Sequence, residues 1–180
     1  MGKLTLITGG ARSGKSTYAE NLIKNEGSEI VYIATAIAFD AGMKDRINKH
    51  QAQRSKDWTT IEKYKNFSKN DIKKSDAVLL DCMTIMVSNL MLDEDVDYDT
   101  CSHEDIDLIE LKIKNEVETL LTVFKDENLY IVTNELGMGI VPSYRMGNIF
   151  RDIAGRINQM IANRADEVYF LVSGIPIKIK

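Results

Sequence analysis

The chain has 180 residues, of which 44% are hydrophobic and 28% are charged, as in a soluble globular domain with a full core. We expect one domain over residues 1–180. The formal net charge of −4 argues against a nucleic-acid-binding surface, and the two cysteines form neither a disulfide framework nor a metal-binding pattern. No apolar stretch is long enough to span a membrane. The first apolar run is too short for a signal peptide, so we expect a cytoplasmic protein.

The first predicted element is an apolar strand over residues 4–8, followed by the sequence GGARSGKS and a helix that begins at Lys15. This is the phosphate-loop motif G-x-x-x-x-G-K-[ST] in the strand–loop–helix context that it requires. Its glycines let backbone N–H groups point at phosphate oxygens, and the helix adds its positive end. Lys15 can reach the β- and γ-phosphates, and Ser16 can ligate Mg²⁺. The predicted nucleotide-binding residues of this motif are Gly9, Gly10, Ala11, Arg12, Ser13, Gly14, Lys15, Ser16 and Thr17.

A second candidate site lies on a helix predicted over residues 41–54. Arg46, His50 and Arg54 recur every four residues, so they lie on one helical face. Two guanidinium groups beside an imidazole suit a phosphate partner. A neutral imidazole nitrogen could attack phosphorus and form a covalent intermediate. The alternative is a solvated basic face without a chemical role.

Two carboxylates follow predicted buried strands. Asp81 ends the strand 76–81 and is the candidate Walker-B acid, which holds Mg²⁺ or its bound water. The alternative for Asp81 is an N-cap of the helix predicted over 82–92. Glu135 follows the strand 129–133 and either positions a nucleophile or metal-bound water, or hydrogen-bonds its own loop.

The segment 93–107 is strongly acidic, and it includes His103. It lacks the ordered spacing of a calcium-binding loop. We therefore expect a solvated loop or helix start without chemistry, in which His103 is exposed and has no catalytic role.

The other predicted elements are, in chain order, strands at 30–35 and 58–62, helices at 106–125 and 143–164, and strands at 168–172 and 175–180. Alternation of strands with helices predicts an α/β domain with a mainly parallel sheet flanked by helices. Ligand sites in such sheets lie at the carboxyl ends of the strands. We therefore expect Gly9, Thr35, Asp81 and Glu135 to lie along one edge.

These stretches together resemble the bifunctional adenosylcobinamide kinase / adenosylcobinamide-phosphate guanylyltransferase family of cobalamin biosynthesis. The resemblance covers nearly the whole chain, and the ordered set is more specific than the phosphate loop alone. The matching stretches are TGGARSGKS at 8–16, YIATA at 32–36, MKDRINKHQAQRSKDW at 43–58, T-x-E at 60–62, LLDCMTIMVSNLM at 79–91, VTNELGMGIVP at 132–142 and residues 150–180.

The resemblance implies a RecA-like P-loop NTPase fold and two reactions. The first transfers the terminal phosphate of ATP or GTP to the aminopropanol hydroxyl of adenosylcobinamide. The second transfers GMP from GTP to that phosphate, which releases pyrophosphate and gives adenosyl-GDP-cobinamide. Mg²⁺ is the expected cofactor, ATP and GTP are the expected substrates, and a homo-oligomer, typically a trimer, is the expected assembly.

The resemblance also implies individual residue roles. The nucleotidylated histidine of the family falls on His50, which would form a histidine–GMP phosphoramidate. The family often has two adjacent histidines, but here Lys49 takes the first place. Arg46 and Arg54 would neutralise charge near the α-phosphorus, and Glu62 would contact the guanosine. Lys15, His50 and Asp81 are the expected catalytic residues, with Ser16 and Asp81 as metal ligands.

Two other functions fit parts of the sequence. A simple P-loop kinase of a small hydroxylated metabolite would need the phosphate loop and Asp81, and would give His50 no covalent role. A RecA-like ATPase module acting on nucleic acid or a protein is disfavoured by the acidic charge balance. A switch GTPase is disfavoured because the sequence NKHQ at 48–51 lacks the acid of the guanine-reading N-K-x-D motif.

Overall fold

The computed structural model of the protein describes residues 2–37, 57–72 and 75–180. The helix predicted over 41–54 lies outside these residues, and so do its candidate site residues Arg46, His50 and Arg54. The strands of the described part are β1 (Leu4–Gly9), β2 (Ile30–Ala34), β3 (Thr59–Glu62), β4 (Ala77–Asp81), β5 (Asn128–Val132), β6 (Glu167–Val172) and β7 (Ile175–Lys178). Its helices are α1 (Lys15–Ile23), α3 (Met83–Leu92), α4 (His103–Val123) and α5 (Arg145–Arg164), with a short 3₁₀ helix, η1 (Lys69–Asp71).

One sheet contains all of these strands, in the order β3-β2-β4-β5-β1-β6-β7. Every neighbouring pair is parallel except β6 and β7, which form an antiparallel hairpin. This arrangement confirms the predicted RecA-like α/β fold with a mainly parallel sheet. β5 separates β1, which leads into the phosphate loop, from β4, which ends in Asp81.

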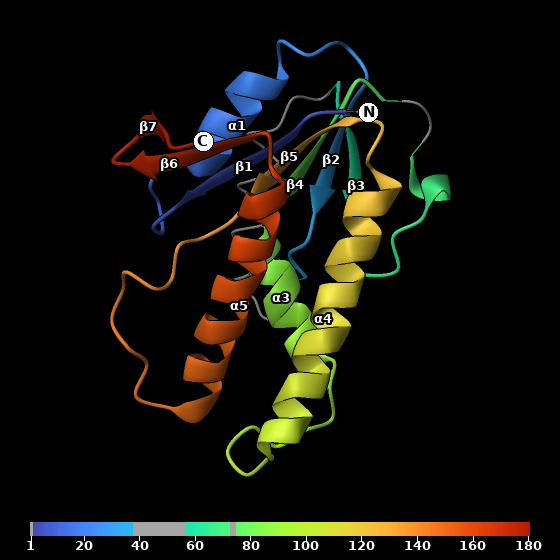
Figure 1. Ribbon diagram of the computed structural model, residues 1–180. Helices are drawn as coiled ribbons and strands as arrows, with labels where there is room; N and C mark the ends of the chain where they lie inside the picture. The colour runs from blue at the N-terminus through green and yellow to red at the C-terminus, as the bar shows by residue number, and fades with distance from the viewer. Residues whose placement is uncertain (1, 38–56, 73–74) are drawn as a thin grey trace.

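Helices cover both faces of the sheet, with α1 on one face and α3, α4 and α5 on the other (Figure 1). β2 and β4 are continuous apolar runs, IVYIA and AVLLD, as expected of central strands that are buried on both faces. The smaller core on the α1 face includes Ala19, Ile23 and Leu79. The larger core on the opposite face includes Ile113 of α4 and Ile157 of α5. Among the described residues, no helix combines the length and apolar character needed to cross a membrane.

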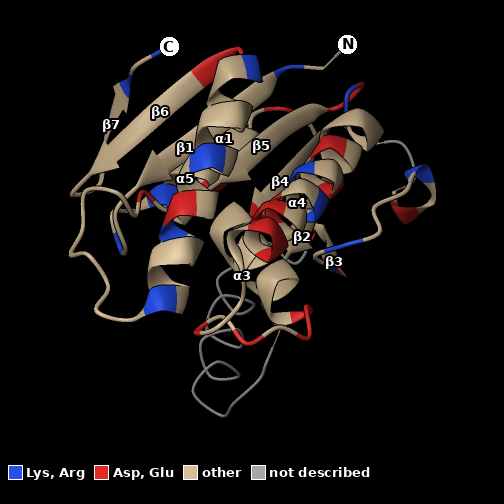
Figure 2. Cartoon of the chain, turned by 60° about the horizontal axis from the view of Figure 1, so that its bottom comes forward, with Lys and Arg blue, Asp and Glu red and all other residues tan. Residues whose placement is uncertain are grey.

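α4 begins three residues earlier than the start predicted at residue 106, because Ser102 caps it. The Ser102 hydroxyl accepts a hydrogen bond from the Asp105 backbone N–H at 3.1 Å, and the Asp105 carboxylate accepts one from the Ser102 N–H at 2.9 Å. Upstream, Asp93 accepts hydrogen bonds from Tyr64 and Lys65. The acidic segment 93–107 is therefore a loop followed by a helix start, as expected, and Figure 2 shows its red stretches between α3 and α4.

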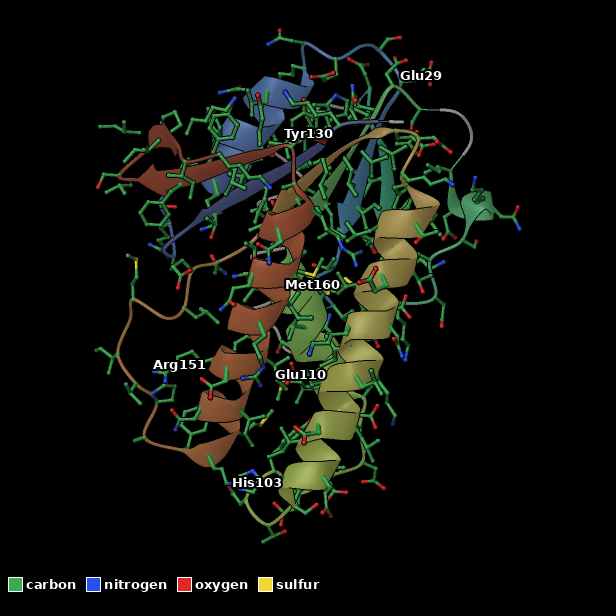
Figure 3. The ribbon with its side chains drawn as sticks, in the orientation of Figure 1. Glu29, His103, Glu110, Tyr130, Arg151 and Met160 are labelled. Atoms are coloured by element: carbon green, nitrogen blue, oxygen red, sulfur yellow. The ribbon has the colours of Figure 1, made fainter. Side chains whose placement is uncertain are left out.

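An ion pair between a buried carboxylate and a partly exposed guanidinium joins α4 to α5. Glu110, whose side chain is only 8% exposed, accepts hydrogen bonds from Arg156 Nε at 2.8 Å and Nη2 at 2.7 Å, and it pairs with Lys114 Nζ at 2.8 Å. It lies on the side of α4 that faces α5 (Figure 3). Burial of the carboxyl raises its pKa, but the hydrogen bonds from Arg156 and Lys114 outweigh burial and lower the pKa overall.

Replacing Arg156 with glutamine is expected to lower the free energy of unfolding by about 2 kcal/mol at pH 7, because it leaves a buried carboxylate with only Lys114 as its partner. Because the folded pKa of Glu110 is depressed, the pair stabilises the fold above the usual value of 4.5. This stabilisation is lost as the pH falls through the folded pKa, so the deficit should shrink below about pH 4. Unfolding of the wild type and the variant by guanidinium chloride, at pH 7 and below pH 4, measures this difference in the free energy of unfolding.

Arg164→Gln is the matched control, since its partner Glu118 is 37% exposed. This variant should lose less than about 1 kcal/mol. Equal losses of unfolding free energy in both variants would contradict a stabilising Glu110–Arg156 ion pair. A loss in Arg156→Gln that does not change with pH would contradict it as well.

Candidate nucleotide-binding site

The phosphate loop curls around its own lysine. Lys15 is buried, and its Nζ donates to the Gly10 carbonyl at 2.6 Å and lies 3.5 Å from Ser13 Oγ. The Ser13 N–H also donates to the Gly10 carbonyl, at 3.3 Å. Burial lowers the pKa of the Lys15 ammonium, and the nearby Asp81 carboxylate acts in the opposite direction. Both acceptors of Nζ are uncharged, so a bound anion would supply the compensating charge that this buried cation needs.

The turn between β6 and β7 packs against the phosphate loop and hydrogen-bonds to it. The Gly174 N–H donates to the Ser13 carbonyl at 2.9 Å. Gly9 (φ +150°) leaves no room for a Cβ, which would lie 2.5 Å from the Leu171 carbonyl oxygen. Gly14 (φ +92°) would place a Cβ 3.3 Å from Gly174 Cα. Glycine at these two positions therefore serves the packing of the loop against β6 as well as its curvature.

Asp81 stands half-buried at the carboxyl end of β4, as predicted. Its Oδ2 accepts a hydrogen bond from the Tyr32 hydroxyl at 2.9 Å. The Tyr32 ring stacks on Trp58, with centroids 6.4 Å apart and an interplanar angle of 25°. Tyr32 lies on β2, the strand next to β4, and its hydrogen bond fixes the orientation of the Asp81 carboxylate. Cys82, the next residue, is buried, and burial raises the pKa of its thiol to about 12.

Glu62 ends β3 on the same row of the sheet as Asp81. Ala34 of β2 is the register partner of both residues. Register partners present their side chains on the same face of a sheet. The two carboxylates therefore share the α1 face, about 10 Å apart across two strand spacings.

Side-chain hydrogen bonds tie β2 to the turn that follows β4. Thr35 Oγ1 donates to the Cys82 carbonyl at 2.8 Å and accepts from the Cys82 N–H at 2.9 Å. The Asn89 amide of α3 donates to the Thr35 carbonyl at 2.7 Å. Thr35 and Asp81 thus lie at one edge of the sheet, as predicted.

A similar network ties the end of β5 to α3 and α5. Thr133 Oγ1 lies 3.1 Å from Thr84 Oγ1 and donates to Asn158 Oδ1 at 2.7 Å. The Asn134 N–H donates to Thr84 Oγ1 at 2.6 Å, and the Asn158 amide donates to the Asn134 carbonyl at 3.0 Å. Thr84 and Thr133 are buried, Asn134 and Asn158 are half-buried, and their mutual hydrogen bonds set the direction in which the chain leaves β5.

Glu135 directly follows Asn134 in the sequence, and it lies beside the start of the phosphate loop. Its backbone N–H donates to the Gly9 carbonyl at 2.9 Å, and its Oε1 accepts from the Gly137 N–H at 2.6 Å. The loop that follows borders a groove of about 700 Å³. Other walls of this groove are phosphate-loop residues 10–13, the first turns of α5 and the end of β6.

The fold thus brings Lys15, Asp81, Glu62 and Glu135 to the carboxyl edge of one sheet. Sequence reasoning missed the partners that orient them, which are Tyr32, the Thr84–Thr133–Asn158 network and the Ser173–Gly174 turn. One signal was available for the first of these. A tyrosine inside a continuous apolar strand needs a hydrogen-bond partner, and strand-end Asp81 on the next strand of the sheet supplies it.

The residues at this edge fit Mg²⁺ bound together with a nucleotide. No group of three or more His, Cys, Asp or Glu residues among the described ones could cage a metal ion. Mg²⁺ usually needs no such cage, because it keeps several waters and binds one or two carboxylates plus substrate phosphates. Asp81 supplies such a carboxylate, and Ser16 lies beside Lys15 at the start of α1.

The sequence is similar to known proteins over nearly its whole length. The sequence model of a family described as "Cobinamide kinase / cobinamide phosphate guanyltransferase" matches residues 5–179. The bifunctional adenosylcobalamin biosynthesis protein CobU of Escherichia coli is 43% identical, over 98% of this chain and 99% of its own length. The protein of the same name from Salmonella typhimurium is 42% identical over the same shares. The bifunctional adenosylcobalamin biosynthesis protein CobP of Pseudomonas aeruginosa is 34% identical over 97% and 96%.

Proposed function

The chain belongs to the cobinamide kinase / cobinamide phosphate guanyltransferase family, and from this premise we propose how its residues carry out two reactions. It is a transferase of cobalamin biosynthesis. It phosphorylates adenosylcobinamide with ATP or GTP, and then transfers GMP from GTP to give adenosyl-GDP-cobinamide. The observation that carries this conclusion is the family match over residues 5–179. A simple kinase or a RecA-like ATPase module is not favoured, since neither accounts for a guanyltransferase family.

In the phosphoryl step, we propose that the phosphate loop holds the triphosphate. Backbone N–H groups of residues 9–17 surround the phosphates, and the Lys15 ammonium contacts the β- and γ-phosphates. The buried position of Lys15 supports this role, because the ammonium then acts in a low-dielectric environment. Mg²⁺, held by Ser16 and Asp81, would neutralise charge that develops on the phosphates.

In the guanylyl step, we propose that a neutral nitrogen of His50 attacks the α-phosphorus of GTP. The bond from this phosphorus to the leaving pyrophosphate breaks, and a phosphoramidate between His50 and GMP forms. A phosphate oxygen of the acceptor then displaces His50 and takes the GMP. Arg46 and Arg54 would neutralise charge at the α-phosphorus, and Glu62 would contact the guanosine.

Replacing Tyr32 with phenylalanine removes the hydroxyl that donates to Asp81 Oδ2. If Asp81 holds Mg²⁺, loss of this orienting hydrogen bond should raise the Mg²⁺ concentration for half-maximal activity by about 10-fold. The rate at saturating Mg²⁺ should change little, because Tyr32 does not touch the nucleotide in this account. Titration of both activities with Mg²⁺ measures the shift. An unchanged Mg²⁺ requirement would argue that Asp81 does not hold the metal.

We propose that the protein is a homo-oligomer, with a trimer as the expected state. Support comes from the edge strand β7 and its continuation, which expose Ile175 (66%), Ile177 (49%) and Ile179 (62%). An exposed apolar edge strand usually pairs or is covered. We also propose a single domain over 1–180, since one sheet contains all described strands, and a cytoplasmic location, where ATP and GTP are available.

The two activities are tested in sequence. Cobinamide is incubated with ATP and Mg²⁺, and the product is identified by mass spectrometry as cobinamide phosphate. GTP is then added, and the account predicts GDP-cobinamide together with one equivalent of pyrophosphate. Phosphorylation without a GDP-linked product would contradict the guanylyltransferase activity and favour a simple P-loop kinase.

A further inference from the structure

The two reactions of this enzyme make different demands on the acceptor. In the kinase step the acceptor is a hydroxyl group, which must lose its proton as its oxygen bonds to phosphorus. In the guanylyl step the acceptor is a phosphate monoester, which is already an anion at neutral pH. General-base catalysis is therefore useful only in the first reaction.

The groove beside the phosphate loop is the place where such a base would act. Residues 10–13 of the loop form one wall, and most of the segment 136–142 forms another. Phe150 and Arg151 of α5 and the end of β6 complete it. Arg151 lies on the side of α5 toward the 133–144 segment (Figure 3). Because residues 10–13 of the phosphate loop line this groove, an acceptor in it would lie beside a triphosphate held by that loop.

Glu135 is the one carboxylate among the described residues that line this groove. Its backbone N–H is bonded to the Gly9 carbonyl, which fixes it beside the first residue of the phosphate loop. A second cavity, of about 710 Å³, also borders Glu135 and contains one further acid, Asp152. Asp152 is 55% exposed and lies 3.7 Å from Arg151, and the phosphate loop does not line that cavity.

The side chain of Glu135 is also held in place. Its Oε1 accepts the Gly137 N–H at 2.6 Å, and the residue is half-buried. Asp81, the other strand-end acid, belongs to β4, which β5 separates from β1. The fold thus places one carboxylate beside the phosphate loop on the groove side, whereas Asp81 lies near Lys15 but does not line the groove.

We propose that Glu135 is the general base of the kinase step, a role that rests on the proposed function above. The acceptor oxygen bonds to the γ-phosphorus while the bond from that phosphorus to the β,γ-bridging oxygen breaks. The nucleoside diphosphate leaves with the electron pair, and the hydroxyl proton passes to the Glu135 carboxylate and then to water. The guanylyl step does not use Glu135.

A purely structural role would be to hold the loop through the Gly137 N–H. Replacing Glu135 with glutamine separates the two roles, because the amide oxygen can still accept this hydrogen bond but the amide does not take up the proton. The test measures two half-reactions of each variant. One is the phosphorylation of cobinamide by ATP, and the other is GMP transfer from GTP to cobinamide phosphate supplied as the acceptor.

Glu135→Gln should slow phosphorylation by about 10²- to 10⁴-fold and leave GMP transfer within about threefold of the wild-type rate. The matched control is Glu29→Gln, an exposed residue at the amino end of β2, far from the groove (Figure 3). It should change neither rate.

Two results would overturn the assignment. An unchanged phosphorylation rate in Glu135→Gln would mean that the carboxylate takes up no proton. Equal rate losses in both half-reactions would mean that Glu135 acts by holding the loop in place or by binding the nucleotide. Failure of the proposed function itself is seen separately, in the wild-type protein. A wild-type protein that phosphorylates cobinamide but does not transfer GMP would leave the Glu135 measurement valid, whereas one without kinase activity would overturn both.

Discussion

Replacing Lys15 with methionine is expected to slow both phosphoryl and guanylyl transfer by about 10³-fold. Both reactions use a nucleoside triphosphate, and we propose that one phosphate loop holds it. The Lys15 ammonium is buried within that loop and hydrogen-bonds only uncharged oxygens in the contacts described above. Methionine keeps the length and apolar stem of the side chain but removes the charge. Initial rates of the two half-reactions measure the loss.

The same substitution should raise the free energy of unfolding of the ligand-free protein, by about 1 kcal/mol. Burial lowers the pKa of Lys15 below its usual value of 10.5, so the folded state disfavours the ammonium. This penalty is fully present below the folded pKa, shrinks as the pH rises through that pKa, and is gone above the unfolded value. A variant that is less active but more stable would show that the cation is maintained for ligand binding.

Lys24→Met, at the exposed end of α1, is the control for both measurements. It should alter neither activity nor stability by a measurable amount. If Lys15→Met instead lost stability, the hydrogen bond to the Gly10 carbonyl would outweigh the cost of burying the charge. If it lost only one activity, the two reactions would not share the phosphate loop.

Replacing His50 with alanine should abolish GMP transfer, with a loss of at least about 10⁴-fold, because the substitution removes the nitrogen that attacks phosphorus in the proposed mechanism. Phosphorylation of cobinamide should continue at close to the wild-type rate, since the proposed mechanism gives His50 no part in that step. The measurement is the pair of half-reactions used for Glu135. Together the two variants should show opposite patterns, one losing only guanylyl transfer and the other only phosphorylation.

The chain contains only two histidines, so replacement of the other one, His103, is the matched control. His103 is exposed at the start of α4, and His103→Ala should leave both rates unchanged (Figure 3). GMP transfer that survives in His50→Ala would exclude His50 as the nucleophile. The plain kinase would then describe the chemistry better than the two-step account.

The fold could be predicted from local patterns because they agree with one another. Apolar runs marked the buried strands, and the glycine-rich loop lies between β1 and α1 as its motif requires. The positions of Asp81 and Glu135 at one edge followed from the rule that parallel strands end together. The start of α4 was predicted three residues too late because the Ser102–Asp105 capping box lies within an acidic stretch in which no apolar periodicity marks the first turn.

The contacts between distant segments could not be predicted. The hydrogen bond from Tyr32 to Asp81 depends on which strands are neighbours, and the sequence does not state that order. The same holds for the Gly174 contact with the phosphate loop, which joins the two ends of the chain. The groove beside Glu135 likewise forms only when α5 and the β6–β7 hairpin are in place.

We propose that this protein transfers GMP through a covalent histidine intermediate. The most direct test incubates it with Mg²⁺ and GTP radiolabelled at either the α- or the γ-phosphate, without cobinamide, and counts the label on denatured protein. We expect label from the α-position only, and this label should be lost in acid, stable in base and absent from His50→Ala. No retained label from either position, or label retained from the γ-position, would contradict it.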